Sequence, residues 1–365
     1  MSYKLRCGVN CKYAPSIVEA MLEFLRSGLF LREPNIEVKD IDWEALMKVS
    51  SEQGVLPWVW DGICQLPIEK SPSRFQKISW VLSVQSCVDR YEKQRKVLSE
   101  LVEICTRNDM RLMLLKGIGL SQMYTKPYYR SSGDIDIFLF DNFEKGNTVF
   151  GLDTETDTGL HTEFVYNGVQ VENHEMFVYP NTPPKKRVSQ YLNSRIPSVI
   201  LTEDGYYTFD TLDNLVYLMM HALNHVNFNE GSSFLNVRNL LDIAMLIYRN
   251  QNLWDVNVVK DLMERLQLTK SFDLIVYLSE LLLEIDLSAY RCGSIKKGDE
   301  RTIRELFCKT CLCVTVPSEE LFVRRVGQCI YRYFLLYKIY RYMPRHKKSF
   351  FLMSMHGLWM QNNHH

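Results

Sequence analysis

The hydrophobic positions in the first third of the chain recur at the three- and four-residue spacing of amphipathic helices. This spacing predicts a helix over residues 16–27 that ends at Gly28, followed by shorter helices over residues 40–53 and 55–66. The longest run of the same pattern covers residues 74–107. We expect one long helix there, or two in series, with the apolar face packed on a sheet.

The pattern changes after the long helix, where short apolar runs alternate with turn residues. The run over residues 112–115 predicts a buried strand, which stops at Lys116 and Gly117. Two helical turns can follow over residues 117–124. A second strand is then predicted over residues 134–140.

Two acidic residues stand two positions apart in that second strand. Because side chains alternate along a strand, Asp134 and Asp136 point to one face, while Ile135 and Ile137 point to the other. Carboxylates about 7 Å apart on one strand repel each other unless a positive group lies between them. A divalent cation is a usual solution, and Mg²⁺ carrying a polyphosphate fits this pair best. Two solvated acids at the start of a strand are the ordinary alternative.

Residues 161–174 predict a β-hairpin. Asn167 and Gly168 suit the two-residue turn that joins twisted strands, and such a turn fixes which residues lie opposite each other. The aromatic and aliphatic pairs share one face, which we expect to pack on helices. The predicted cross-strand pairs are Tyr166 with Val169, Phe164 with Val171, Glu163 with Glu172, and His161 with His174.

The other face of this hairpin gathers Glu163, Glu172, His161 and His174. Glutamates directly opposite each other destabilise a hairpin unless a cation or another partner offsets their charges. An ordinary exposed polar face would have to account for two acids and two histidines that closely follow the Asp-x-Asp strand. We therefore interpret this face as part of a functional site.

The second half of the chain is predicted to be mainly helical. Residues 141–159 are interpreted as a short helix or an elaborated loop. Residues 180–187 are interpreted as a loop whose three basic residues could reach phosphates or simply be solvated. Strong helical patterns cover residues 213–226 and 235–248, and two or three more helices fit between residues 254 and 314.

The first two of these helices carry polar pairs one turn apart. His221 and His225 resemble the spacing of a zinc protease, but the glutamate that such an enzyme needs is replaced by Ala222. Histidines that belong to the core or face a substrate are the better interpretation. Arg238 and Asp242 are also four residues apart, and an ion pair on the helix surface accounts for them equally well.

Composition limits the class of protein and its partners. The chain has 365 residues, with 43 Lys plus Arg and 43 Asp plus Glu, so no net charge draws it toward nucleic acid. No signal-peptide pattern opens the chain, and its most apolar windows are shorter than the ~20 residues of a membrane span. We therefore expect a soluble, cytoplasmic protein.

Ten cysteines are scattered along the chain. Cys308, Cys311 and Cys313 are close enough to suggest zinc, but no second pair stands at the spacing of a zinc finger or ribbon. Buried or surface thiols are the better interpretation, and reduced thiols agree with the cytoplasm.

The tail over residues 321–365 contains no acid, eight Lys or Arg, and several tyrosines. A basic aromatic helix of this kind could touch a membrane surface or nucleic acid. Packing as a terminal helix, with cationic side chains laid over apolar neighbours, is the alternative that we favour.

The order of the central motifs is similar to that of a known family. The segments "LLKGIGLSQMY" and "YRSSGDIDIFL" resemble the uncharacterised bacterial nucleotidyltransferase family, which belongs to the polymerase-β-like nucleotidyltransferase superfamily. The segments "DWEALMKVSSEQGVLPWVWDGI", "HALNHV" and "LNVRNLLDIAMLI" resemble the same family. The resemblance implies an α+β fold, with a small mixed β-sheet as the nucleotidyltransferase core. We expect an N-terminal helical region over 1–87, the core over 88–207 and a C-terminal helical region over 208–365.

The resemblance also implies a metal site. Its two metal-binding aspartates match Asp134 and Asp136, and its third carboxylate, in an acidic-x-His pair, matches Glu172 and His174. Relatives often have Asp where this chain has Glu172. These three carboxylates are the expected catalytic residues and ligands of Mg²⁺ or Mn²⁺.

The residues around these acids have supporting roles in the same hypothesis. Lys116 and Gly117, with Arg130 and Ser131 in the turn before the acids, are expected to bind the nucleotide phosphates. The residues that could orient the metal ligands or contact the acceptor are His161, Glu163 and His174.

Together these features predict a metal-dependent nucleotidyltransferase. It would move a nucleoside monophosphate from an NTP, with ATP expected, to an acceptor hydroxyl and release pyrophosphate. One alternative is a non-catalytic nucleotide-binding or scaffold protein that keeps the fold. A metal-dependent glycosyltransferase is a weaker alternative, because it normally has a longer alternation of strands and helices before its Asp-x-Asp motif.

Overall fold

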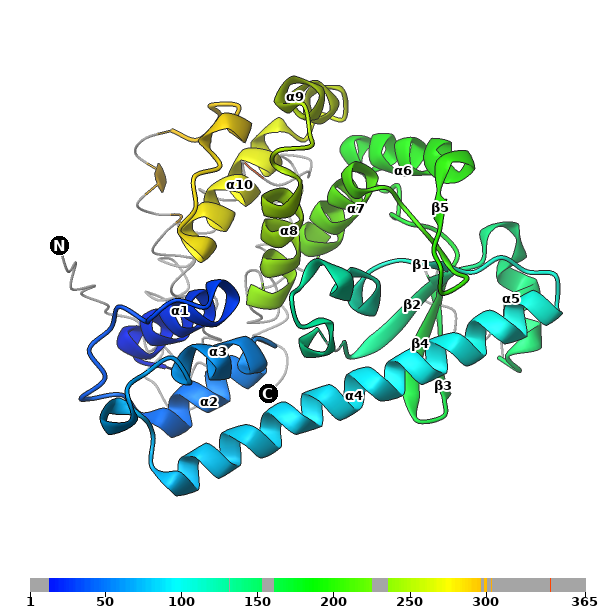
Figure 1. Cartoon of the computed structure of the whole chain (residues 1–365). Coiled ribbons are helices and arrows are strands. Elements are labelled where there is room, and N and C mark those ends of the chain that lie inside the picture. Colours follow the sequence, from blue (N-terminus) through cyan, green and yellow to red (C-terminus); the bar gives the residue numbers. More distant parts are fainter. Residues whose placement is uncertain are drawn as a thin grey trace, which may run out of the picture. The chain divides into compact units, whose positions relative to one another are not determined.

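The computed structural model of the protein (Figure 1) describes residues 13–130, 132–152, 161–224, 236–296, 299–300, 303 and 342. By its internal contacts the chain divides into two compact units. One contains the described residues of 1–80, 221–244 and 254–365, and the other contains those of 81–220 and 245–253. The three-part division expected from the sequence stays a prediction.

Six strands form a mixed sheet inside the second unit. They are β1 (Met113–Leu114), β2 (Asp134–Phe138), β3 (His161–Tyr166), β4 (Val169–His174), β5 (Ile200–Leu201) and β6 (Tyr207–Thr208). Their order across the sheet is β3-β4-β2-β1-β6-β5. The β2–β4 and β1–β6 pairs are parallel, and the other neighbours are antiparallel. With the surrounding helices this sheet confirms the predicted α+β fold.

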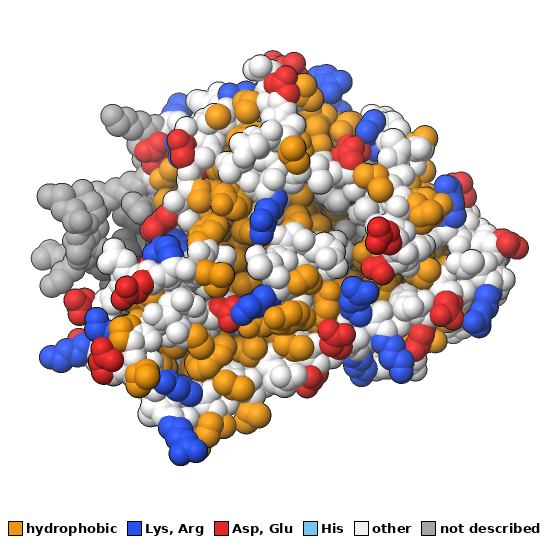
Figure 2. Space-filling model, viewed as in Figure 1, with side chains coloured by type: hydrophobic (Ala, Val, Ile, Leu, Met, Phe, Trp, Pro, Cys, Tyr) orange, Lys and Arg blue, Asp and Glu red, His pale blue; other side chains and the backbone are white. Residues whose placement is uncertain are grey.

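One long helix, α4 (Arg74–Arg107), covers one face of the sheet. Its residues Tyr91, Leu98 and Leu101 are buried in the same core as Ile135 of β2 and Val171 of β4. This confirms a single helix and the packing of the apolar hairpin face on it. Acidic and basic side chains are interspersed over the C-terminal part of α4, on the right of the view (Figure 2).

The beginning of α4 differs from the prediction. Ile78 and Leu82 lie on the predicted apolar face but are 51% and 65% exposed. The sheet-packed part of the helix begins near Tyr91. The helical period was therefore right, but the prediction that the whole apolar face packs on the sheet was wrong.

The opposite face of β2 holds the acidic residues at one end and an aromatic cluster at the other. Asp134, Asp136 and Phe138 alternate with the buried Ile135 and Ile137. The Phe138 ring lies 4.3 Å from that of Phe177, which also contacts Phe209 and Tyr217. Tyr217 belongs to α7 (Thr211–Asn224). This aromatic cluster fixes the far end of the acid-bearing face.

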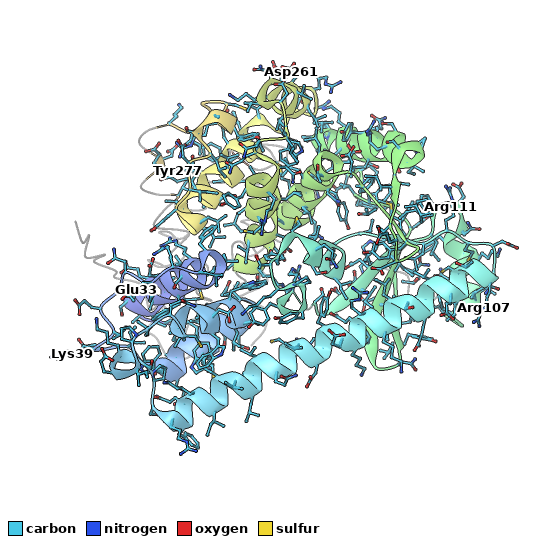
Figure 3. The ribbon with its side chains drawn as sticks, viewed as in Figure 1. Glu33, Lys39, Arg107, Arg111, Asp261 and Tyr277 are labelled. Atoms are coloured by element: carbon cyan, nitrogen blue, oxygen red, sulfur yellow. The ribbon has the colours of Figure 1, made fainter. Side chains whose placement is uncertain are left out.

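Smaller elements complete the second unit. The predicted turns after β1 form a 3₁₀ helix, η2 (Gly117–Met123), followed by η3 (Pro127–Tyr129). The predicted short helix after β2 is α5 (Phe143–Val149). The Arg111 guanidinium lies 4.2 Å from the centre of the Phe140 ring, which ties the chain just before β1 to the turn after β2 (Figure 3).

Three local predictions in this unit were wrong. β2 ends at Phe138 rather than at residue 140, because Phe140 turns the chain with a φ of +57°. Residues 183–187 begin a helix, α6 (Pro183–Arg195), where a loop was expected. The short strands β5 and β6 precede α7 and were not predicted.

The first unit is helical where it is described. Its helices include α1 (Pro15–Phe30), α2 (Trp43–Glu52), α3 (Leu56–Ile63), α9 (Val256–Arg265) and α10 (Thr269–Leu283), and α8 (Val237–Asn250) crosses the boundary of the units. Gly28 does not end α1, as was predicted, but lies inside it. A Cβ atom at Gly28 would lie 1.9 Å from the Trp58 carbonyl oxygen, and one at Gly62 equally close to that of Phe24. These two glycines let α1 and α3 touch backbone to backbone.

Several predicted features fall outside the described residues. They include His225, the Cys308–Cys313 cluster and the basic tail, of which Tyr342 alone is described. Among the described helices, none has the length and apolar character that crossing a membrane requires.

Candidate functional site

Strands β2 and β4 bring three carboxylates together on one face of the sheet. Asp134 and Asp136 are two positions apart on β2, and the parallel pairing places Glu172 of β4 directly beside Asp136. One oxygen from each carboxylate lies within 4.8 Å of the other two. The Asp136 side chain is fully buried, whereas those of Asp134 and Glu172 are 27% and 18% exposed.

The hairpin turn determines which way Glu172 points. The predicted register, with Glu163 opposite Glu172 and His161 opposite His174, is the one observed. A shift of one residue would have turned Glu172 to the face that packs on α4. The Asn167–Gly168 turn, with both residues at positive φ, therefore positions an acid that is more than thirty residues away from the aspartates in sequence.

Lys116, between β1 and η2, provides a positive charge among these acids. Its Nζ lies 2.8 Å from Asp136 Oδ1 and 3.6 Å from Asp134 Oδ2. Burial alone would lower the pKa of Lys116, but the charges of Asp136 and Asp134 raise it above its ordinary value. The lysine is therefore charged and acts as the internal counter-ion of the aspartates.

His174 contacts two of the three acids. Its Nε2 lies 3.0 Å from Asp136 Oδ1 and 3.2 Å from Glu172 Oε2. Carboxylates only accept hydrogen bonds, so the ring nitrogen is the donor. Burial alone would lower the pKa of His174, but these two hydrogen bonds raise it.

Asp136 remains ionised in this setting. Burial alone would raise its pKa, yet the charge of Lys116 and the hydrogen bond from His174 hold that pKa well below its usual range. Asp136 thus keeps a negative charge although its side chain is fully buried.

The turn before β2 is held from two sides. The Ser132 hydroxyl donates to Asp134 Oδ1 at 3.1 Å. The buried Gln94 side chain of α4 accepts from the Ser132 backbone N–H at 3.0 Å and donates to the Ser132 carbonyl at 3.1 Å. On the other side, a Cβ atom at Gly117 would lie 2.9 Å from the Ser132 hydroxyl. Gln94 and Gly117 together define where Ser132 and Asp134 lie.

Gln94 and Ser132 are contributions that the sequence prediction missed. Gln94 is an ordinary polar residue within a helical pattern, and nothing nearby in sequence indicates its distant partner. Ser132 could have been found, because it stands two residues before Asp134, the spacing at which a hydroxyl can hydrogen-bond to a neighbouring carboxylate.

The outer strand of the hairpin carries a separate pair. His161 Nε2 lies 3.2 Å from Glu163 Oε1, and the Gln170 amide donates to Glu163 Oε2 at 3.1 Å. The Glu163 side chain is 50% exposed. His161 and Gln170 thus supply hydrogen-bond partners for Glu163.

Two of the other three predicted phosphate-binding residues belong to the described part of the structure. Gly117 has a φ of +64° and begins η2 beside the acids. Arg130 is only 3% exposed, and its role in phosphate binding stays a prediction. Ser131 falls outside the described residues.

The acids fit a divalent cation. Asp136 Oδ2 is buried and has no hydrogen-bond partner among the described residues, although buried polar atoms are normally paired. The three carboxylates offer the hard oxygen ligands that Mg²⁺ and Mn²⁺ prefer. Both the orphaned oxygen and the chemistry of the donors therefore suit such an ion.

The chain also matches a known protein family. Residues 39–284 match the family described as uncharacterised nucleotidyltransferase. This range covers more than half of the chain and includes all three carboxylates. No curated protein and no solved structure matches the chain.

Proposed function

Since the chain belongs to the uncharacterised nucleotidyltransferase family, we propose that it moves a nucleoside monophosphate from an NTP to an acceptor hydroxyl. The expected donor is ATP, and pyrophosphate is the other product. The observation that carries the proposal is the convergence of Asp134, Asp136 and Glu172 within 4.8 Å on adjacent strands. Two aspartates would be enough to bind a nucleotide. The presence of a third acid therefore favours an enzyme that transfers the nucleotide over a protein that only binds it.

The three carboxylates would hold a divalent cation, Mg²⁺ or Mn²⁺. When bound, such an ion offsets triphosphate charge and makes a coordinated hydroxyl easier to deprotonate. Asp136 is ionised and buried, so it can bind a cation without first losing a proton. Glu172 lies beside it and is more exposed, which suits the residue that accepts the acceptor's proton.

Lys116 and His174 have complementary tasks at the site. Lys116 now pairs with both aspartates. Its long side chain can turn to the phosphates once a cation offsets the carboxylates, and it would then stabilise the charge on the leaving pyrophosphate. His174 donates to Asp136 and Glu172 and thereby orients both acids toward the same point.

Ser132 and Gly117 prepare the approach of the phosphates. Ser132 orients Asp134 through its hydroxyl. Gly117 lets the backbone at the start of η2 pass close to that hydroxyl, where a Cβ atom would lie only 2.9 Å from it. We place the reaction in the cytoplasm, with which the reduced thiols of Cys105 and Cys292 agree.

The test is transfer of label from an NTP. The full chain is incubated with each α-³²P-labelled NTP, Mg²⁺ and a cell extract, and the labelled product is identified. We expect one nucleotide, ATP in the first instance, to label a defined acceptor. Glu172→Gln should reduce the transfer rate by at least ~10²-fold, the usual loss when a general base is removed, while nucleotide binding stays within a few-fold of wild type.

Two variants serve as controls. Glu175→Gln changes an exposed glutamate three residues away and should transfer like wild type. Glu163→Gln should have a much smaller effect than Glu172→Gln, because Glu163 lies one strand further from the aspartates. Nucleotide binding without labelling of any acceptor would instead support the non-catalytic alternative. Full transfer by Glu172→Gln would overturn the role of Glu172.

A further inference from the structure

A second group of potential metal ligands lies at the edge of the acid cluster. The hairpin pairs His161 directly with His174, and the centres of their rings are 5.1 Å apart. Glu172 lies on the same face, two residues before His174. One ligand atom from each of His161, Glu172 and His174 lies within 4.8 Å of the other two.

The donor set of this group differs from that of the three carboxylates. Two imidazole nitrogens and one carboxylate oxygen suit Mn²⁺, Co²⁺ or Zn²⁺, whereas Mg²⁺ strongly prefers oxygen ligands. We propose that His161, Glu172 and His174 form a second divalent-cation site, selective for transition metals, which shares Glu172 with the oxygen site. The proposal rests on the proposed function only in taking the three carboxylates as the Mg²⁺ site.

The present contacts of the two histidines are compatible with binding a cation. His174 is 5% exposed, and its Nδ1 has no hydrogen-bond partner among the described residues. The ring therefore has one nitrogen engaged by Asp136 and Glu172 and a second one available to a ligand. A buried imidazole nitrogen without a partner is uncommon, and a bound ion is one way to satisfy it.

The contact of His161 with Glu163 can be exchanged when an ion binds. His161 Nε2 contacts Glu163 Oε1 at 3.2 Å. The Glu163 side chain is 50% exposed, so water can replace this contact. The ligand atoms need to approach one another by up to about 1.5 Å to reach the spacing found around a tetrahedral ion with ligands at about 2.1 Å.

The two groups share Glu172, but each also contains a residue that the other lacks. Glu172 belongs to both groups, Asp134 only to the oxygen group, and His161 only to the histidine group. Substitutions at Asp134 and His161 therefore separate the sites. An ion in the histidine group would hold Glu172 and His174 in place beside the reaction centre while Mg²⁺ occupies the oxygen group.

Binding of Co²⁺ tests the proposal without any measurement of activity. The full chain, freed of metal and kept in excess Mg²⁺, is titrated with Co²⁺ and followed by visible absorption and equilibrium dialysis. We expect one Co²⁺ per chain, with the d–d absorption of nitrogen–oxygen coordination. His161→Ala should weaken this binding by at least ~10-fold, whereas Asp134→Asn should leave it within a few-fold of wild type.

Controls make the outcome decisive. Glu163→Gln removes the negative charge beside His161 but changes no proposed ligand, and it should bind Co²⁺ within a few-fold of wild type. His161→Asn serves as a second variant if His161→Ala unfolds. Co²⁺ binding that survives both His161 variants, or that is lost with Asp134→Asn, would overturn the second site. Label transfer in Mg²⁺ alone does not depend on this result, so the two proposals can fail separately.

Discussion

At the residue scale, the site is defined by balanced charges. Asp134, Asp136 and Glu172 would repel one another on adjacent strands, and Lys116 and His174 offset that repulsion. Both side chains are largely buried, so their contacts are only weakly screened by water. A divalent cation must therefore compete with the Lys116 charge and with the hydrogen bonds of His174.

This balance predicts a pH dependence of stability. The pKa of His174 is raised on folding, so the folded protein binds a proton more tightly than the unfolded chain. The stabilisation is fully present below the ordinary histidine pKa of about 6.5 and is lost as pH rises through the raised value. In metal-free protein, the free energy of unfolding of wild type relative to His174→Gln should therefore decrease with rising pH.

Urea denaturation of the two proteins at a series of pH values measures this difference. A parallel series with His221→Gln, which changes a histidine of α7, controls for the loss of a histidine in general. A constant difference between wild type and His174→Gln across the series would contradict the assigned contacts of His174.

A second residue-scale prediction concerns the glycine beside the acids. Gly117 has a φ of +64°, and its added Cβ would lie 2.9 Å from Ser132 Oγ. Gly117→Ala should destabilise the protein by about 1–2 kcal/mol, the cost of the left-handed conformation for other residues, and should weaken nucleotide binding by displacing Ser132.

Gly133 provides the control. It lies three residues from Asp136, and a Cβ there meets nothing within 4 Å. Gly133→Ala should unfold like wild type, and equal effects of the two changes would contradict the account.

At the element scale, the long helix α4 does more than cover the sheet. Gln94 is 1% exposed and satisfies both backbone groups of Ser132. Two hydrogen bonds from the Gln94 side chain thus attach the turn before β2 to α4. The position of the first aspartate depends on a helix that lies far away in sequence.

Removing this attachment has a measurable cost. Gln94→Ala leaves the buried N–H and carbonyl of Ser132 without partners and should destabilise the protein by about 2–4 kcal/mol in denaturant unfolding. Gln85→Ala, on the same helix, removes only an exposed hydrogen bond to Asp89 and should change stability by no more than about 0.5 kcal/mol. Comparable losses in the two variants would show that Gln94 has no special role.

The sequence predicted those elements whose determinants are local. The Asn167–Gly168 turn sets its own register, and with the alternation along β2 it placed Glu172 on the face of Asp134 and Asp136. The contribution of Gln94 depends on a partner 38 residues away, which no local pattern contains. The two-residue strands β5 and β6 are too short for alternation to be visible. The three basic residues 185–187 led to the prediction of a solvated loop. The prolines before them, at 183 and 184, instead begin the helix α6.

At the scale of the whole molecule, the site belongs to a single unit. All three carboxylates, with Lys116 and Gln94, lie within residues 81–220, whereas the family match extends over residues 39–284 and includes parts of both units. The chain carries equal numbers of acidic and basic residues, so its net charge does not steer a charged acceptor over long distances. We expect recognition of the acceptor to depend on contacts close to the site.

The central claim is that the carboxylates hold a nucleotide through a divalent cation, and calorimetry of nucleotide binding tests it most directly. The titration compares binding of a non-hydrolysable ATP analogue to the full chain with and without Mg²⁺. It is repeated for Asp136→Asn and, as a control, for the exposed Asp141→Asn. We predict that Mg²⁺ strengthens binding to wild type and to Asp141→Asn, and that Asp136→Asn removes most of this gain. Equal affinity in all three proteins, with no gain from Mg²⁺, would contradict the claim.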